Sequence, residues 1–119
     1  MFSYCNVNPE NKRTNDCVCR AISLATDNDY YYIQYLLNSN AYSNRCDMLT
    51  KVCYRNLLED FFGLEPRYGN GRTVVEVARR YPDNKVIMRI DSHLTCSCYG
   101  VVKDTWDCSH ELVDEYWVV

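Results

Sequence analysis

The chain has 119 residues, of which 47% are apolar and 24% charged, a composition that fits one globular domain and excludes a disordered or fibrous protein. Thirteen basic and sixteen acidic side chains give a net charge of -3, whereas proteins that bind a phosphate backbone usually carry a basic excess, so we expect no nucleic-acid partner. No apolar run reaches the ~18 residues of a membrane-spanning helix. The polar start, Met1 to Arg13, lacks the apolar stretch of a signal peptide. We therefore expect a soluble protein with no membrane partner, which stays in the compartment where it is made.

The first part of the chain predicts an extended arm followed by two helices. The opening fourteen residues are rich in asparagine and charged side chains, so we expect an extended arm or loop there. Residues 14–16 offer three consecutive N-cap side chains, and the apolar residues of 18–25 recur at spacings of three and four. After a polar turn, a short second helix is expected over residues 30–37, and residues 38–44 are expected to form a loop.

Two further helices precede the sheet. Asp47 can cap the first of them, and residues 64–72 after it are turn-rich. The expected apolar stripe of this helix consists of Met48, Leu49, Val52, Cys53, Leu57 and Phe61. Thr73 followed by Glu76 is a capping-box pattern, which opens a fourth helix over residues 74–81.

The last third of the chain has the alternation of β-strands. We expect strands over residues 85–90, 93–98, 101–106 and 116–119, with Tyr99-Gly100 as a two-residue hairpin turn. Helices followed by hairpins indicate an α+β fold, in which N-terminal helices pack on a C-terminal antiparallel β-sheet. No linker divides the chain, so a single domain covers residues 1–119.

Eight cysteines are many for this length. In a secreted chain they would predict four disulfides, but without a secretion signal we expect reduced thiols and no disulfide framework. The pairs Cys17-x-Cys19, Cys96-x-Cys98 and Cys108-x-His110 have a one-residue gap, which is too short for a zinc knuckle. We therefore expect neither a metal nor a cofactor.

Three side chains together suggest nucleophilic catalysis. Cys17 lies in the first turn of a helix, where the helix dipole favours the thiolate. His93 begins a strand, and Asp104 lies on the strand that returns from it. If Tyr99-Gly100 is the turn, His93 faces Trp106, and Asp104 shares their face of the hairpin. Each residue alone has an ordinary structural interpretation, but jointly they supply a thiol, a base and an orienting carboxylate.

The order of these residues resembles the papain-like cysteine peptidases, in which a helical Cys, a His and an Asn-Ser-Trp motif follow one another. Asp104-Thr105-Trp106 looks like a counterpart of the last motif. The segment from Asn15 to Ile22, His93-Leu94-Thr95 and Asp104 to Asp107 together are most similar to short phage-encoded proteins of this superfamily. The resemblance covers nearly the whole chain and implies a minimal papain-like core with a short substrate cleft.

The resemblance also implies the role of each residue. Cys17 would be the nucleophile, His93 the base, Asp104 the orienter, and Trp106 the ring that shields the base–orienter hydrogen bond from water. The glutamine that helps to form the oxyanion hole in the family lies six residues before the nucleophile, where this chain has Asn11. Asn15, two residues before Cys17, is the other choice, and both stay open at this point.

Asp16 and Arg20 flank the expected nucleophile. Their four-residue spacing suits a helical ion pair, and we favour this structural role for Arg20 over substrate binding. A carboxylate beside Cys17 would disfavour the thiolate, so Asp16 is expected to point away from an active Cys17.

The sequence thus predicts a cysteine hydrolase that cleaves a peptide or isopeptide amide with no cofactor and takes a protein or peptide as substrate. An acyl transferase would use the same residues, and a peptidoglycan hydrolase is a third, less favoured reading because no wall-binding module is present. The alternative is a catalytically silent papain-like phage protein, either a virion component or a binder of a host protein, whose eleven tyrosines would suit an adhesive surface. Either protein would be found in the host cytoplasm or in the virion.

Overall fold

A computed structural model describes all 119 residues and has the expected α+β architecture, with four helices packed against one sheet. The helices are α1 (Cys17–Thr26), α2 (Tyr30–Asn44), α3 (Lys51–Asn56), which continues into the π-helical turn η1 (Leu57–Phe61), and α4 (Val74–Arg80). The strands are β1 (Phe2–Tyr4), β2 (Pro66–Tyr68), β3 (Lys85–Ile90), β4 (His93–Cys98), β5 (Val101–Asp104) and β6 (Glu115–Val118).

The six strands form one mixed sheet in the order β1-β5-β4-β3-β6-β2. The four central strands are antiparallel, as expected, but β1 pairs in parallel with β5, so the prediction of a purely antiparallel sheet is wrong. The edge strand β1 lies in the segment expected to be an extended arm or loop, and β2 lies in the turn-rich segment 64–72. Both have only three residues and are largely exposed, and strands this short carry no readable alternation.

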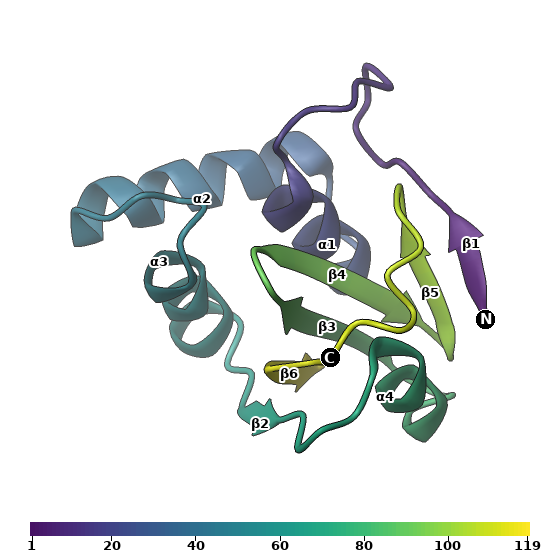
Figure 1. The fold of residues 1–119 in the computed structure, drawn as a ribbon. Helices are drawn as coiled ribbons and strands as arrows, with labels where there is room; N and C mark the ends of the chain where they lie inside the picture. The colour runs from purple at the N-terminus through teal and green to yellow at the C-terminus, as the bar shows by residue number, and fades with distance from the viewer.

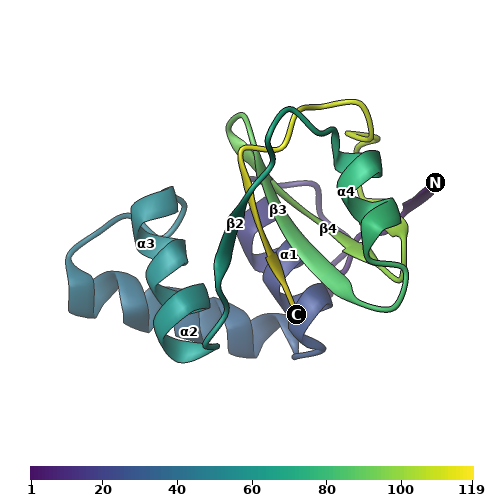
Figure 2. The ribbon, with the colours of Figure 1, turned by 90° about the horizontal axis from the view of Figure 1, so that it is seen from below.

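The sheet separates two apolar clusters. On one face, residues of α1, α2, α3 and η1 pack with Ile87, Leu94 and Trp117. On the other face, α4 packs with alternate residues of β3, such as Val86 and Met88. Figures 1 and 2 show α2 and α3 side by side at one end of the molecule and α4 at the other. This arrangement places the start of α1 next to the start of β4.

The second and third helices differ most from the sequence expectation. α2 runs to Asn44, through residues expected to be a loop, and its later part is held against α3 by a hydrogen bond from Asn40 Nδ2 to the Cys53 carbonyl at 2.8 Å. α3 starts after Thr50 instead of Asp47, because the Asp47 carboxylate accepts from the Leu49 backbone and closes a turn before the helix. These tertiary and local turn contacts leave no periodic signal in the sequence.

Other local expectations are confirmed. Thr73 and Glu76 form both hydrogen bonds of the capping box at the start of α4. Tyr99 and Gly100 have φ values of 53° and 84°, the left-handed conformation that a type I′ hairpin turn requires. Cys98 pairs with Val101 across this turn. This pairing is the strand register from which Asp104 was expected to share a face of the hairpin with His93.

The prediction of eight reduced thiols is wrong, because Cys46 and Cys53 form a disulfide. The loop after α2 returns to α3 and brings the two Cα atoms within 5.6 Å, a separation that suits a disulfide. The other six cysteines are free thiols. A rule based on cell compartment cannot detect such a local approach of two cysteines seven residues apart.

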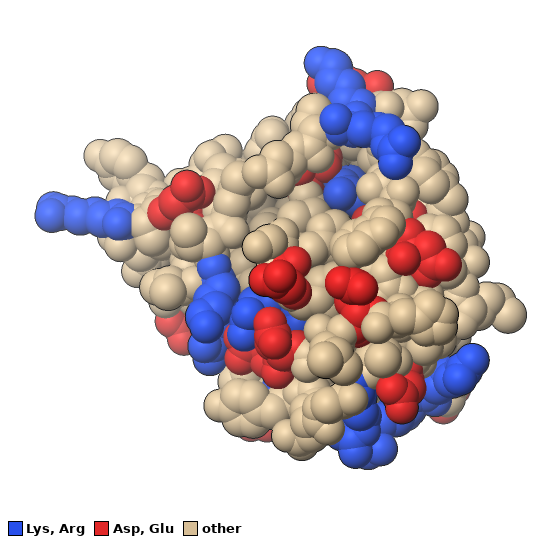
Figure 3. All heavy atoms as spheres, in the orientation of Figure 1, with Lys and Arg blue, Asp and Glu red and all other residues tan.

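None of the helices has both the length and the apolar character needed to span a membrane. On the face shown in Figure 3, basic and acidic side chains are interspersed, and they form no broad, continuous basic patch.

Candidate active site

Cys17 is the first residue of α1 and is half-buried. Asp16 occupies the N-cap position, but its side chain makes no capping hydrogen bond. The backbone N–H groups at the start of α1 therefore remain unpaired by that carboxylate, and the positive end of the helix dipole lies at the thiol. A helix start of this kind favours a thiolate and can bind an oxyanion.

His93 and Asp104 are hydrogen-bonded at the open end of the β4–β5 hairpin. The His93 Nε2 to Asp104 Oδ2 distance is 2.7 Å, and the Asp104 side chain is only 3% exposed. Trp106 packs edge-on against the imidazole, with the ring centroids 5.2 Å apart, although the residue is 46% exposed. The structure therefore brings His93, Asp104 and Trp106 together, with the indole covering part of the imidazole.

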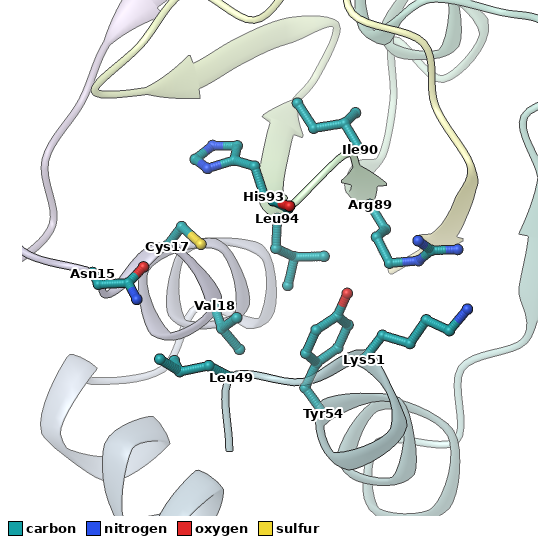
Figure 4. A pocket seen from close by; sticks show the side chains of 11 residues that line it. Asn15, Cys17, Val18, Leu49, Lys51, Tyr54, Arg89, Ile90, His93 and Leu94 are labelled. Atoms are coloured by element: carbon teal, nitrogen blue, oxygen red, sulfur yellow. The ribbon is translucent and has the colours of Figure 1, made fainter. Parts of the chain in front are cut away.

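Cys17 and His93 line the same pocket from two different elements, as Figure 4 shows. Burial alone would raise the pKa of the Cys17 thiol, but its interactions with the His93 imidazole and the Leu94 backbone outweigh burial and lower this pKa. Because Asp104 occupies Nε2, Nδ1 is the ring nitrogen left to face the thiol.

The same contacts act on the imidazole and the carboxylate. Burial opposes charge on His93, but Asp104 and Cys17 raise its pKa to about 9. Burial likewise opposes charge on Asp104, but hydrogen bonds led by that from His93 lower its pKa to about 2. A lowered thiol pKa beside a raised imidazole pKa favours a thiolate–imidazolium pair near neutral pH.

Arg20 connects this group to the start of α1. Its Nε donates to Asp16 Oδ1 at 2.7 Å, and its Nη1 donates to Asp104 Oδ1 at 2.9 Å. The expected pair of Asp16 and Arg20 is present, but the contact with Asp104 has no local sequence signal, since 84 residues separate the two. Arg20 is buried, with 10% of its side chain exposed, and lies behind the site.

Asp16 points away from Cys17 into this buried network. Its Oδ2 accepts from the Tyr30 hydroxyl at 2.8 Å and from Asn8 Nδ2 at 3.0 Å. The Arg20 cation binds Oδ1, so the negative charge next to the thiol has a buried cationic partner. Asn8 and Tyr30 were not singled out from the sequence, because nothing local marks an asparagine in a loop or a tyrosine among eleven as part of such a network.

The pocket in front of Cys17 has a volume of about 290 Å³. It is lined by Asn15, Cys17, Val18, Leu49, Lys51, Tyr54, Arg89, Ile90, Ser92, His93 and Leu94. Asn15 thus lies beside the thiol, as Figure 4 shows. Asn11 does not line the pocket, since it is exposed in a turn where its N–H donates to the Asn8 carbonyl. Of the two residues considered as oxyanion donors, only Asn15 lines the pocket.

Cys108 lies behind the imidazole and gives this end of the sheet a set of donor atoms that zinc can use. One donor atom each from His93, Asp104 and Cys108 lies within 4.8 Å of the others. The 2.7 Å contact between His93 and Asp104 is, however, a hydrogen bond, and the Arg20 cation already binds Asp104. Burial also raises the pKa of Cys108 to about 11, which disfavours the thiolate that zinc requires. The arrangement therefore fits a proton-transfer group better than a metal centre.

Comparison of the chain with protein-family models, curated proteins and solved structures found no match.

Proposed function

We propose that the protein is a cysteine hydrolase that cleaves a peptide or isopeptide amide. The observation that carries the proposal is the 2.7 Å hydrogen bond between His93 and Asp104, with Cys17 lining the same pocket at the start of a helix. The residue order of the papain-like peptidases supports it as a resemblance. The expected substrate is a protein or peptide, and the expected location is the host cytoplasm or the virion.

In this mechanism, the Cys17 thiolate attacks the amide carbonyl carbon and forms a tetrahedral oxyanion. The backbone N–H of Cys17 and the Asn15 side chain are the donors available to that oxyanion. The His93 imidazolium then protonates the leaving nitrogen as the C–N bond breaks, which leaves an acyl-thioenzyme and a free amine. A water molecule, deprotonated by His93, attacks the thioester and releases the carboxylic acid and the thiolate.

Asp104 holds the imidazole by Nε2 throughout this cycle, so that Nδ1 faces the sulfur and the substrate. Trp106 covers part of the ring and limits the access of water to the base–orienter hydrogen bond. Arg20 and the Thr105 backbone N–H both donate to Asp104 Oδ1, which leaves Oδ2 for His93. We therefore assign a positioning role to Arg20.

One observation favours the alternative, a protein that binds a partner without catalysis. Tyr31, Tyr32, Tyr35 and Tyr42 are all exposed on α2, on a helix whose buried residues are few. An exposed set of tyrosines suits a virion contact or a host-protein interface. A binder of this kind would not need a reactive thiol, so the reactivity of Cys17 separates the two functions.

The test compares the six free cysteines for their rate of reaction with iodoacetamide at pH 7, followed by peptide mass mapping. If the protein is a hydrolase, Cys17 should react fastest with iodoacetamide. The wild-type chain should also hydrolyse p-nitrophenyl acetate with an acyl-enzyme burst, and Cys17→Ser should not. Cys98 is an internal control, because Cys96 lowers its pKa to about 7 while the side chain stays buried. A Cys17 no faster than Cys98 would refute the hydrolase and favour the binding protein.

A further inference from the structure

Three polar side chains gather at the end of the pocket away from Cys17. Lys51, Tyr54 and Arg89 come from α3 and β3, and Figure 4 shows them together on the side opposite Asn15 and Cys17. The proposed hydrolysis of an amide uses none of them. They belong to the region where a substrate group next to the scissile bond would lie.

Tyr54 has a hydroxyl without a partner. The residue is only 4% exposed and packs edge-on against Trp117, yet the hydroxyl makes no hydrogen bond within the protein. Burial raises its pKa, so the hydroxyl keeps its proton and remains a donor. The hydroxyl is not among the buried polar atoms that lack a partner, so on a residue that lines the pocket it is open to a ligand and free to donate to an acceptor there.

Arg89 is held in place with one nitrogen left free. Its Nε donates to Glu115 at 3.1 Å and its Nη1 donates to Asp114 at 3.0 Å, while Nη2 makes no hydrogen bond. Two ion pairs thus fix the guanidinium, which reduces the entropy that binding would cost. The remaining N–H groups of Nη2 are available for a further acceptor.

Lys51 adds a positive charge that no carboxylate of the protein neutralises. Its side chain is exposed and forms no ion pair. None of the eleven residues that line the pocket is an aspartate or a glutamate. The pocket therefore offers a hydroxyl donor, a fixed guanidinium and a free ammonium group, and no competing acidic side chain in its wall.

We propose that Lys51, Tyr54 and Arg89 form a subsite that binds a carboxylate of the substrate. The inference rests on the proposed function in one respect, namely that the ligand is the substrate cleaved at Cys17. Val18, Leu49, Ile90 and Leu94 form the apolar wall of the pocket and suit a short aliphatic chain between the amide and the carboxylate. The carboxylate could be an acidic side chain or a free C-terminus.

The test measures the binding of three small ligands to the full chain by ¹H–¹⁵N chemical-shift titration at low ionic strength. N-acetyl-glutamate amide carries a side-chain carboxylate, N-acetyl-glutamine carries a terminal carboxylate, and N-acetyl-glutamine amide is neutral. At least one charged ligand should bind about tenfold more tightly than the neutral one, the size expected for a charge-assisted hydrogen bond. The ligand that binds better identifies the source of the carboxylate.

The variants Lys51→Met and Tyr54→Phe should each reduce this preference several-fold, whereas Arg79→Met, which removes an exposed charge on α4, should not. Equal binding of all three ligands would overturn the subsite, as would a preference that survives both Lys51→Met and Tyr54→Phe. Because binding is measured without turnover, an inert Cys17 refutes the hydrolase and leaves the subsite standing. If Cys17 is reactive but the chain shows no preference for a carboxylate, the subsite is refuted and the hydrolase stands.

Discussion

Arg20 binds one oxygen of Asp104 at 2.9 Å while His93 binds the other at 2.7 Å, so a single buried carboxylate is held between two cationic groups. Arg20 is in turn held by Asp16 at 2.7 Å. The ionised groups therefore form a line of alternating charge, in the order Asp16, Arg20, Asp104, His93 and Cys17. Each charge along this line has an opposite neighbour, which allows so many ionised groups to be buried together.

Loss of Arg20 should be costly for stability. Arg20→Gln removes the partner of two buried carboxylates and should lower the free energy of unfolding by about 3–5 kcal/mol, as expected when one member of a buried ion pair is removed. The matched control is Arg55→Gln, which breaks a partly exposed pair with Glu59 at the same four-residue spacing. Arg55 also lies 3.6 Å from the buried Glu115, but that carboxylate keeps its closer partner Arg89, so this variant should cost about 1 kcal/mol or less. Urea denaturation of both variants measures the difference, and similar losses would contradict the importance of the Asp16–Arg20–Asp104 network.

The carboxylate of Asp104 should control the ionisation of the thiol. In Asp104→Asn the His93 pKa, about 9 in the wild type, should fall, because the imidazolium loses its main charged partner. The thiolate of Cys17 then loses its imidazolium partner, so its pKa rises and its alkylation near pH 7 becomes slower. The pH dependence of iodoacetamide reaction measures this shift.

Asparagine is preferred to alanine at this position, because Asp104 is buried and pairs with Arg20, and an alanine would remove packing as well. Asp107 provides the control. It is exposed and accepts only from Ser109, so Asp107→Asn should leave the alkylation profile unchanged. If the profile shifts in Asp107→Asn but not in Asp104→Asn, Asp107 and not Asp104 is the carboxylate that orients His93.

The disulfide should be present in the folded protein isolated without reductant. Thiol titration under denaturing conditions should then count six free thiols, not eight. Cys46→Ser should lower the free energy of unfolding by roughly 2 kcal/mol, the chain-entropy value for so short a loop. Reduction of the wild-type protein should lower its free energy of unfolding by the same amount as Cys46→Ser. A count of eight free thiols before reduction would rule the disulfide out.

The parts of the fold that follow from local pattern could be predicted from the sequence. The bounds of β3 and β4 and the capping box of α4 depend on alternation and on neighbouring side chains, and the structure has them as expected. The approach of His93 to Asp104 also had a local basis, since one hairpin turn at Tyr99-Gly100 determines it.

The remaining features depend on contacts between distant segments. The parallel pairing of β1 with β5, the contact of Arg20 with Asp104, and the gathering of Lys51 and Arg89 at one pocket each join residues more than thirty positions apart. Nothing in the residues themselves specifies such partners. The choice between Asn11 and Asn15 belongs to the same class, because both precede Cys17 and only the path of the loop separates them.

That choice gives the last prediction. Asn15 lines the pocket beside Cys17, so Asn15→Ala should remove one donor to the oxyanion and lower the acylation rate with p-nitrophenyl acetate by about 10²-fold, the lower end of the range for such a donor. The rate of iodoacetamide alkylation should change little, because alkylation forms no oxyanion. Asn11→Ala should affect neither rate, since Asn11 is exposed in a separate turn. Equal loss of acylation and alkylation in Asn15→Ala would mean that Asn15 supports the thiolate or the start of α1, and the oxyanion would then depend on the backbone N–H of Cys17 alone.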